Sequence, residues 1–172
     1  MRARKDPRRQ LQGRIAKARG AEFERQLAAS FEYYAETGRA LVEKTPEPMR
    51  PVQSLGNGKF IAFYERKAQP DFKGMLWGGQ TVVLEAKWTG TDRMNQNRVL
   101  PVQAEFMDKY HSMGAACYVI AGFSSGMIYR IPWKTWQNMQ EYFGRKYIQD
   151  GEKKLDKFLV LRSSTGIALL LD

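Results

Sequence analysis

Apolar side chains recur along this chain with two periods, a helical one and an extended one. The helical period is clearest between residues 20 and 38, where four side chains follow one another at spacings of four, four and three: Phe23, Leu27, Phe31 and Tyr34. Such spacing places all four on one face, so the segment is predicted to be an amphipathic helix that ends at Gly38. Similar spacing predicts helices over residues 100–114 and 133–143.

Shorter apolar runs, bounded by glycine, proline or polar residues, predict strands. They cover residues 39–44, 59–67, 71–77, 80–88, 115–123 and 126–132, and two more are expected around a Ser-Ser-Thr-Gly turn within 157–172. Residues 45–51 contain three prolines, which are expected to prevent regular structure and to stiffen an exposed excursion. Residues 89–98 are expected to form a polar loop. The whole pattern predicts an α/β fold with a central mixed sheet flanked by helices.

The length and charge of the chain indicate a single domain with a basic N-terminal extension. The chain has 172 residues, of which 43% are hydrophobic, and this fits one compact domain. Twenty-eight Lys and Arg against 18 Asp and Glu give a formal charge of +10, which points to a polyanionic partner, nucleic acid first of all. Much of that charge lies in residues 1–19, which we expect to form a flexible arm ahead of one domain over residues 20–172.

Two groups of basic side chains are candidates for contact with a phosphate backbone. The first belongs to the arm: Arg8, Arg9, Arg14, Lys17 and Arg19. The second surrounds the excursion at about residues 45–70 and the segment after it: Lys59, Arg66, Lys67 and Lys73. Both groups would neutralise phosphates without reading base sequence. The alternatives are a solubilising tail for the first group and strand edges protected by lysine for the second.

Several other classes of protein are disfavoured. No apolar segment follows the basic start, and none approaches the ~18 apolar residues of a membrane span, so we expect a soluble, cytoplasmic protein with no membrane partner. The single cysteine, Cys117, excludes an internal disulfide and a thiolate zinc site, and is expected to be a small core residue. His111 is not expected to bind a metal, because hard cations prefer oxygen ligands.

The segment QTVVLEAKWTG, residues 80–90, places Glu85 and Lys87 on one face of a strand that otherwise reads as buried. The position of Asp71, in the preceding strand, depends on the turn between the two strands. With a two-residue loop, Gly78–Gly79, Asp71 faces away from Glu85, since a slip of one residue reverses the faces. With a three-residue loop, Trp77–Gly79, Asp71 lies opposite Glu85, and a bulge at Gly74 would have the same effect.

Opposed carboxylates would repel each other unless a cation bridges them. A hard divalent ion such as Mg²⁺ suits the pair, because it takes carboxylate oxygen and water and shares its shell with substrate phosphate. Lys87 would then orient a water or stabilise charge on the phosphate, so the residues favour metal-assisted phosphodiester hydrolysis. The alternative is a Glu–Lys pair on a solvated strand face, without catalysis.

These residues also resemble a known signature. The segment PDFKGMLWGGQTVVLEAK matches the PD-(D/E)xK nuclease motif at Pro70–Asp71 and at Glu85–Ala86–Lys87. In order along the chain, RGAEFERQLAASFEYY, EKTPEPMRPVQ, DFKGMLWGG, LEAKWT, LPVQAEFMDKYHSMGAACYVIAGF and YRIPWKTW resemble Holliday junction resolvases of the RecU type. The resemblance extends from about Gly20 to Trp136.

The resemblance implies a restriction-endonuclease-like fold with a short stalk, a homodimer, and paired Mg²⁺-dependent nicks that resolve four-way DNA junctions, with Mn²⁺ as a substitute metal. It implies that Asp71, Glu85 and Ala86 hold the metal and that Lys87 is the catalytic lysine. Gln103 would support the site from a helix. Glu24 matches an acidic residue near the metal in related archaeal-type resolvases, with Glu22 as the alternative. A branch-migration protein would be a further partner.

The sequence departs from the family pattern in two places. Pro70 stands where the family often has threonine, and the stalk is a few residues shorter, which puts junction selectivity in more doubt than nuclease chemistry. Two other functions therefore stay open: another DNA nuclease of the PD-(D/E)xK superfamily, of the restriction or repair type, or a non-catalytic DNA-binding recombination module.

Overall fold

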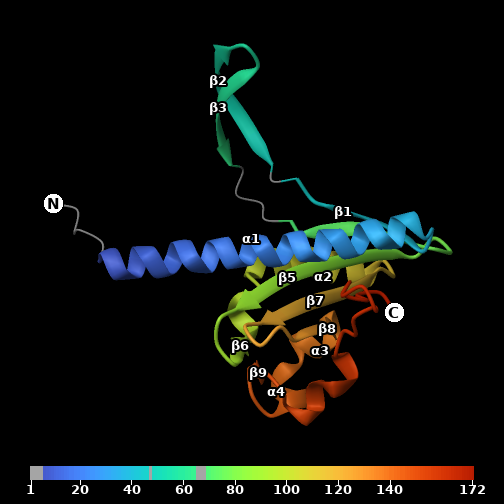
Figure 1. Ribbon diagram of the computed structural model, residues 1–172. Helices are drawn as coiled ribbons and strands as arrows, with labels where there is room; N and C mark the ends of the chain where they lie inside the picture. The colour runs from blue at the N-terminus through green and yellow to red at the C-terminus, as the bar shows by residue number, and fades with distance from the viewer. Residues whose placement is uncertain (1–5, 47, 65–68) are drawn as a thin grey trace.

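A five-stranded sheet forms the centre of the protein, which is known from a computed structural model that describes residues 6–46, 48–64 and 69–172 (Figure 1). The strand order is β1-β4-β5-β7-β8. The bounds are Ala40–Lys44 for β1, Phe72–Leu76 for β4, Thr81–Thr89 for β5, Ala116–Phe123 for β7 and Ile128–Pro132 for β8. Only β5 and β7 run parallel, whereas the other neighbours are antiparallel. The predicted central mixed sheet is thus confirmed.

Helices cover both faces of this sheet. Helix α1, Pro7–Glu36, crosses one face, and the other face carries α2, Pro101–Ser112, with the short helices α3, Trp133–Gln137, and α4, Met139–Phe143 (Figure 1). Strand β5 is buried on both sides, since Val82 and Leu84 belong to the core beneath α1 and Val83 to the core beneath α2. None of the helices in the described part of the chain has the length and apolar character that crossing a bilayer requires.

Helix α1 is longer than the sequence predicts. Its buried side chains begin at Phe23 and continue through Tyr34, as the apolar spacing indicates, but the helix itself starts at Pro7. A proline at the first helical position loses no hydrogen bond, because that N–H has no intrahelical partner. The described part of the basic arm is therefore helical and exposed up to Arg19. Its expected mobility stays a prediction.

The excursion forms a separate two-stranded hairpin that stands clear of the body (Figure 1). Its strands are β2, Met49–Gly56, and β3, Lys59–Tyr64. The expectation that the prolines prevent regular structure is wrong for β2, because Pro51 lies within it and is opposite Ala62. A proline is tolerated at an edge or bulge, and the register of this hairpin shifts between Pro51 and Gln53. We call this hairpin the stalk.

Residues 89–98 and 133–172 differ most from the prediction. The expected polar loop contains β6, Arg93–Asn95, which pairs with β9, Tyr147–Gln149, and continues into the 3₁₀ helix η1, Gln96–Arg98. The third predicted helix is divided at Asn138. The two final strands are absent from the described tail, which has the 3₁₀ helix η2, Lys153–Phe158, and only isolated bridges.

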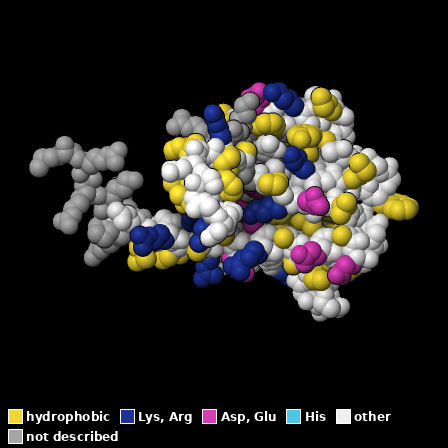
Figure 2. Space-filling model, turned by 90° about the horizontal axis from the view of Figure 1, so that it is seen from above, with side chains coloured by type: hydrophobic (Ala, Val, Ile, Leu, Met, Phe, Trp, Pro, Cys, Tyr) yellow, Lys and Arg dark blue, Asp and Glu magenta, His cyan; other side chains and the backbone are white. Residues whose placement is uncertain are grey.

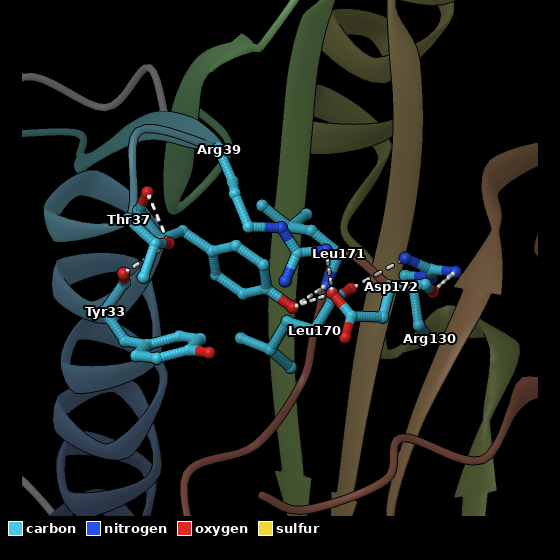
Figure 3. A network of polar contacts seen from close by, with 8 residues as sticks. Tyr33, Thr37, Arg39, Arg130, Leu170, Leu171 and Asp172 are labelled. Atoms are coloured by element: carbon cyan, nitrogen blue, oxygen red, sulfur yellow. Dashed lines mark hydrogen bonds and ion pairs between the residues drawn. The ribbon is translucent and has the colours of Figure 1, made fainter.

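Side-chain contacts add to a few backbone bonds, such as Leu169 N–H to the Leu161 carbonyl at 2.8 Å, in fixing the end of the described chain. The Tyr34 hydroxyl donates to Asp172 at 2.7 Å and accepts from the Leu171 N–H at 3.0 Å (Figure 3). Arg39 binds the Asp172 carboxylate at 2.6 Å, and Arg130 donates to the Leu170 carbonyl at 2.9 Å. Burial is the main reason that the pKa of Tyr34 is raised to about 12. This tyrosine thus stays a neutral donor that ties the tail to α1.

Candidate active site

The β4–β5 hairpin determines where the two predicted acidic residues meet. Its register pairs Phe72 with Leu84, and the Leu76 N–H donates to the Gln80 carbonyl at 2.8 Å, so the loop has three residues, Trp77–Gly79. This register, continued by one residue, places Asp71 opposite Glu85. The three-residue alternative is therefore correct, and the pairing is regular through Gly74, without a bulge.

Gly74 has a different role. A Cβ at this position would lie 2.0 Å from the Leu41 carbonyl oxygen, so only glycine allows β1 to approach β4 so closely. The approach matters for the site because β1 carries Lys44, which pairs with Phe72, the residue after Asp71. The Thr45 N–H in turn donates to the Asp71 carbonyl at 2.8 Å.

The pairing of β4 with β5 ends at Leu84, which leaves the edge of β5 open beyond this point. The Asp71 side chain occupies that edge: its Oδ2 accepts the Ala86 N–H at 2.8 Å. A carboxylate thus takes the position that a backbone carbonyl would have if the strand continued. This bond fixes the Asp71 carboxyl beside Glu85.

Glu85, Lys87 and Gln103 form one hydrogen-bonded cluster. Glu85 Oε1 accepts from Lys87 Nζ and from Gln103 Nε2, each at 2.5 Å. Gln103 Oε1 accepts from Lys87 Nζ at 3.2 Å and from the Leu100 N–H at 3.0 Å. The last bond caps the start of α2, so the helix end holds the glutamine in place. The structure thus brings together the two strand residues and the helix glutamine that the sequence singled out.

Burial sets the electrostatics of the two acids. Glu85 is fully buried, and this burial is the main cause that raises its pKa to about 8, with a further contribution from the Asp71 carboxyl and an opposing one from Lys87. The pKa of Asp71 is also raised, chiefly by burial, although the Ala86 N–H and Lys87 oppose the change. Without a bound cation, burial therefore favours the protonated form of Glu85.

A Glu85→Gln substitution is expected to stabilise the protein without divalent ions at alkaline pH. The pKa of Glu85 lies above its ordinary value of 4.5, so its contribution to stability is complete below about pH 4.5 and is lost as the pH rises through 8. A neutral amide avoids this loss and keeps an acceptor for Lys87. Urea denaturation should show a gain of about 1–3 kcal/mol at about pH 8.5 and little change at about pH 5.

The control for this prediction is Glu32→Gln, which removes a carboxylate from the exposed side of α1. It should leave the pH dependence of unfolding as it is in the unchanged protein. If unfolding of the Glu85→Gln protein depended on pH in the same way as unfolding of the unchanged protein, this would contradict the assignment of a buried, protonated carboxyl at this position.

Of the two acidic candidates on α1, Glu24 lies at the site and Glu22 does not. The negative charge of Glu24 raises the pKa of Asp71, which requires proximity, and Glu24 is bound by Lys44 Nζ at 2.7 Å. Glu22 pairs with Arg25 on the exposed side of the helix. The sequence did not point to Lys44, because its place beside Asp71 depends on the pairing of β1 with β4.

The donor set fits a hard divalent cation. Glu85 Oε2 is buried and has no hydrogen-bond partner among the described residues, so a carboxylate oxygen beside Asp71 is free to act as a ligand. In the part of the chain that the structure describes, no three or more His, Cys, Asp or Glu side chains are grouped so that they could hold a metal ion. Two carboxylates still suffice for Mg²⁺, which keeps several waters and shares its shell with substrate phosphate. Ala86 has only its carbonyl oxygen to offer.

The structure locates part of the predicted basic surface. Arg14, Lys17 and Arg19 are exposed on α1, and Lys59 is exposed at the start of β3. Lys73 is half-buried and donates to Gln69 at 2.6 Å. Figure 2, which looks onto the side from which the stalk projects, shows Lys and Arg side chains gathered on the part nearest the projecting helix. The side chains of Arg8, Arg9, Arg66 and Lys67 lie outside the described residues.

The aromatic side chains of α3 and α4 and the single cysteine belong to the core. Trp133, Trp136 and Phe143 are buried, and Tyr142 packs against the same cluster, so they offer no platform for bases. Cys117 is buried too, and burial raises the pKa of its thiol to about 11.

A mixed sheet with a Pro-Asp pair and a Glu-x-Lys triplet meeting on one hairpin defines a protein of the PD-(D/E)xK class. Within that class the chain belongs to the RecU family: residues 18–169 match the family described as Recombination protein U.

Individual proteins are also similar to this chain. The chain is 29% identical over 113 residues to the Holliday junction resolvase RecU of Streptococcus pneumoniae (strain Hungary19A-6), which covers 62% of this chain and 57% of the relative. The same values hold for the protein of strain CGSP14. The chain thus spans little more than half the length of these relatives. Among solved structures, Archaeoglobus fulgidus Hjc, a Holliday junction resolvase, is similar with a TM-score of 0.44 and 14% identity, over 68% of this chain and 75% of that one.

Proposed function

We propose that this protein is a Mg²⁺-dependent endonuclease that resolves four-way DNA junctions by paired phosphodiester hydrolysis. The observation that carries the proposal is the cluster of Asp71, Glu85, Lys87 and Gln103, held at the open edge of β5 by hydrogen bonds of 2.5–3.2 Å. Membership in a family whose curated relatives are named Holliday junction resolvases supports the choice of substrate.

Each residue of the cluster has a separate task in this proposal. Asp71 and Glu85 would hold the ion, with the Ala86 carbonyl as a further ligand and Glu24 nearby. The chemistry that bound Mg²⁺ supplies is polarisation of the phosphodiester and acidification of a water. The ammonium of Lys87 stabilises charge on the phosphate or orients the attacking water. Gln103 positions Lys87 and Glu85 together, because it binds both.

The proposed substrate implies separate roles for a second subunit, the helical arm and the stalk. A four-way junction requires cuts in two strands, so we infer a homodimer with one active site for each strand. The helical arm would contact phosphates through Arg14, Lys17 and Arg19, and the stalk would enter the junction. Contacts of this kind are sequence-independent and weaken as salt rises.

A cleavage panel tests the proposal. The protein is incubated with a four-way junction, a flap, a nicked duplex and a linear duplex of matched sequence, with Mg²⁺, with Mn²⁺ and with EDTA. We expect symmetric nicks in the junction with either ion, no product with EDTA, and slower or no cleavage of the other substrates. Cleavage of all four at similar rates would indicate a restriction or repair nuclease. Binding without product in large enzyme excess would indicate a non-catalytic recombination module.

A further inference from the structure

A hollow separate from the catalytic cluster opens at one end of the sheet. It lies between α1, the ends of β5 and β7, and the turn that leads into β8, and its volume is about 410 Å³. This is within the range of roughly 300–1,000 Å³ that is typical of small-molecule sites. Its lining includes two arginines, a glutamine and a tryptophan: Arg19, Arg162, Gln26 and Trp88. None of them belongs to the catalytic cluster.

Arg162 brings a positive charge into this hollow. Its guanidinium donates to the Gly166 carbonyl at 3.0 Å and to the Gly126 carbonyl at 3.4 Å. In the amide orientation that its neighbours require, the Gln26 oxygen also accepts from it, at 2.9 and 3.0 Å. All these partners are neutral oxygens, which fix the position of the guanidinium without cancelling its charge. These bonds use the four N–H groups of the two terminal nitrogens, so the guanidinium offers an anion its uncancelled charge and its Nε–H.

The second cation is Arg19, which is exposed on α1. The one acidic side chain among the described lining residues, Glu22, forms an ion pair with Arg25 and so does not neutralise the arginines of the hollow. The hollow thus has two arginines against one carboxylate that already has a partner. Its electrostatics favour an anionic ligand.

Trp88 supplies an apolar wall. Its half-buried indole lies against the backbone of Gly90, where an added Cβ would be 3.2 Å from the ring. A flat aromatic ring beside cations is the arrangement on which an unpaired base stacks while its phosphate is bound. The ligand class indicated by these groups together is a nucleotide.

The strand register places the hollow relative to the catalytic cluster. Trp88 follows Lys87 in β5, and Asp71 directly precedes β4, which runs antiparallel to β5. The catalytic cluster and the hollow therefore lie at the same end of the sheet. In register, Trp88 pairs with Gly122 of β7, one strand farther from Asp71. Trp88 faces α1 together with Leu84 and Ala86, whereas Glu85 and Lys87 face Gln103 of α2, so the hollow lies across the sheet from the cluster at this end.

We propose that this hollow binds one unpaired nucleotide of the DNA substrate, with its base on Trp88 and its phosphate between Arg19 and Arg162. The assignment rests on the proposed nuclease function for the identity of the substrate. Bases at a branch point are unstacked more easily than those inside a duplex, so such a subsite would select among positions along a junction.

Fluorescence of 2-aminopurine tests this subsite without requiring cleavage. A short single-stranded deoxyoligonucleotide that carries one such base is titrated with the protein in EDTA. We expect the base to be quenched by the indole, and Trp88→Leu to remove the quench and to weaken binding roughly tenfold. Trp88→Phe should restore much of the affinity. The control is Trp77→Leu, since this indole is 85% exposed at the hairpin tip, at the opposite end of the sheet.

The phosphate half of the subsite is tested by Arg162→Gln. We expect weaker binding and a shallower salt dependence, while Lys153→Gln, which removes an exposed cation from η2, changes neither. On a junction, the Trp88→Leu protein should also cut at an altered distribution of positions. Unchanged quenching in Trp88→Leu, or unchanged binding in Arg162→Gln, would overturn the subsite even if the unchanged protein cleaves junctions. A failure to cleave any junction would overturn the nuclease proposal alone.

Discussion

An Asp71→Asn protein is expected to bind a four-way junction with nearly unchanged affinity and to cleave it at least a hundredfold more slowly. Asparagine can accept the Ala86 N–H bond that Asp71 makes at 2.8 Å, so the hairpin keeps its geometry. What is lost is one of two carboxylates that would hold the cation. Loss of a single preorganised electrostatic group costs roughly 10²–10³ in kcat, and a metal ligand should cost no less. Single-turnover cleavage of a labelled junction in Mg²⁺ measures the rate.

The matched control is Asp92→Asn, which removes the same charge from an exposed position where the carboxylate accepts from Gln149 at 3.2 Å. It should cleave at the rate of the unchanged protein. Wild-type rates in the Asp71→Asn protein would eliminate the metal assignment. A loss of junction binding in this protein would instead place Asp71 in substrate binding.

The sequence could predict the hairpin site because local rules determine it. Alternation places Glu85 and Lys87 on one face, and the loop length alone decides whether Asp71 joins them. The choice between two and three loop residues could not be made from sequence, since both are sterically allowed for the glycines 78 and 79. The structure resolves it through the Leu76 and Gln80 pairing.

Contacts between distant segments set the limit of sequence reasoning. Lys44 reaches Glu24 only because β1 packs beside β4 and α1 crosses the sheet, and no local pattern encodes that meeting. The tail reads as strands by its apolar alternation. Its backbone instead follows side-chain anchors such as Arg130 and Tyr34, which are far away in sequence. In such cases tertiary contacts override local propensity.

The candidate site lowers the stability of the fold, because it buries a carboxyl group whose hydrogen bonding is incomplete. Glu85 is buried with one oxygen unpartnered, and the Asp71 carboxyl lies nearby. Well-packed proteins rarely leave a polar atom in that condition unless it serves a function. We therefore expect Glu85→Gln both to stabilise the protein and, by removing one of the two proposed metal ligands, to slow cleavage, the usual conflict between stability and activity.

Removal of the stalk should have the largest effect on substrate choice. Its apolar side chains are 44% to 68% exposed: Met49, Val52, Leu55, Phe60, Ile61 and Phe63. Such a surface on a projecting hairpin indicates an interaction site. It makes little contribution to the core, because none of these side chains belongs to either buried cluster.

A protein in which residues 49–64 are replaced by a short Gly-Ser linker is therefore expected to fold with a similar unfolding midpoint and to lose its preference for junctions. The ratio of junction to linear-duplex cleavage should fall by at least tenfold, since apolar wedges into a base stack are worth a few kcal/mol per step. Phe60→Ser with Phe63→Ser should give part of this loss, and Trp77→Ser, which changes an exposed aromatic residue on the body, should give none. An unchanged ratio in the linker protein would assign junction selectivity to the body of the enzyme. In that case the helical arm and the hollow beneath it become the surfaces to vary next.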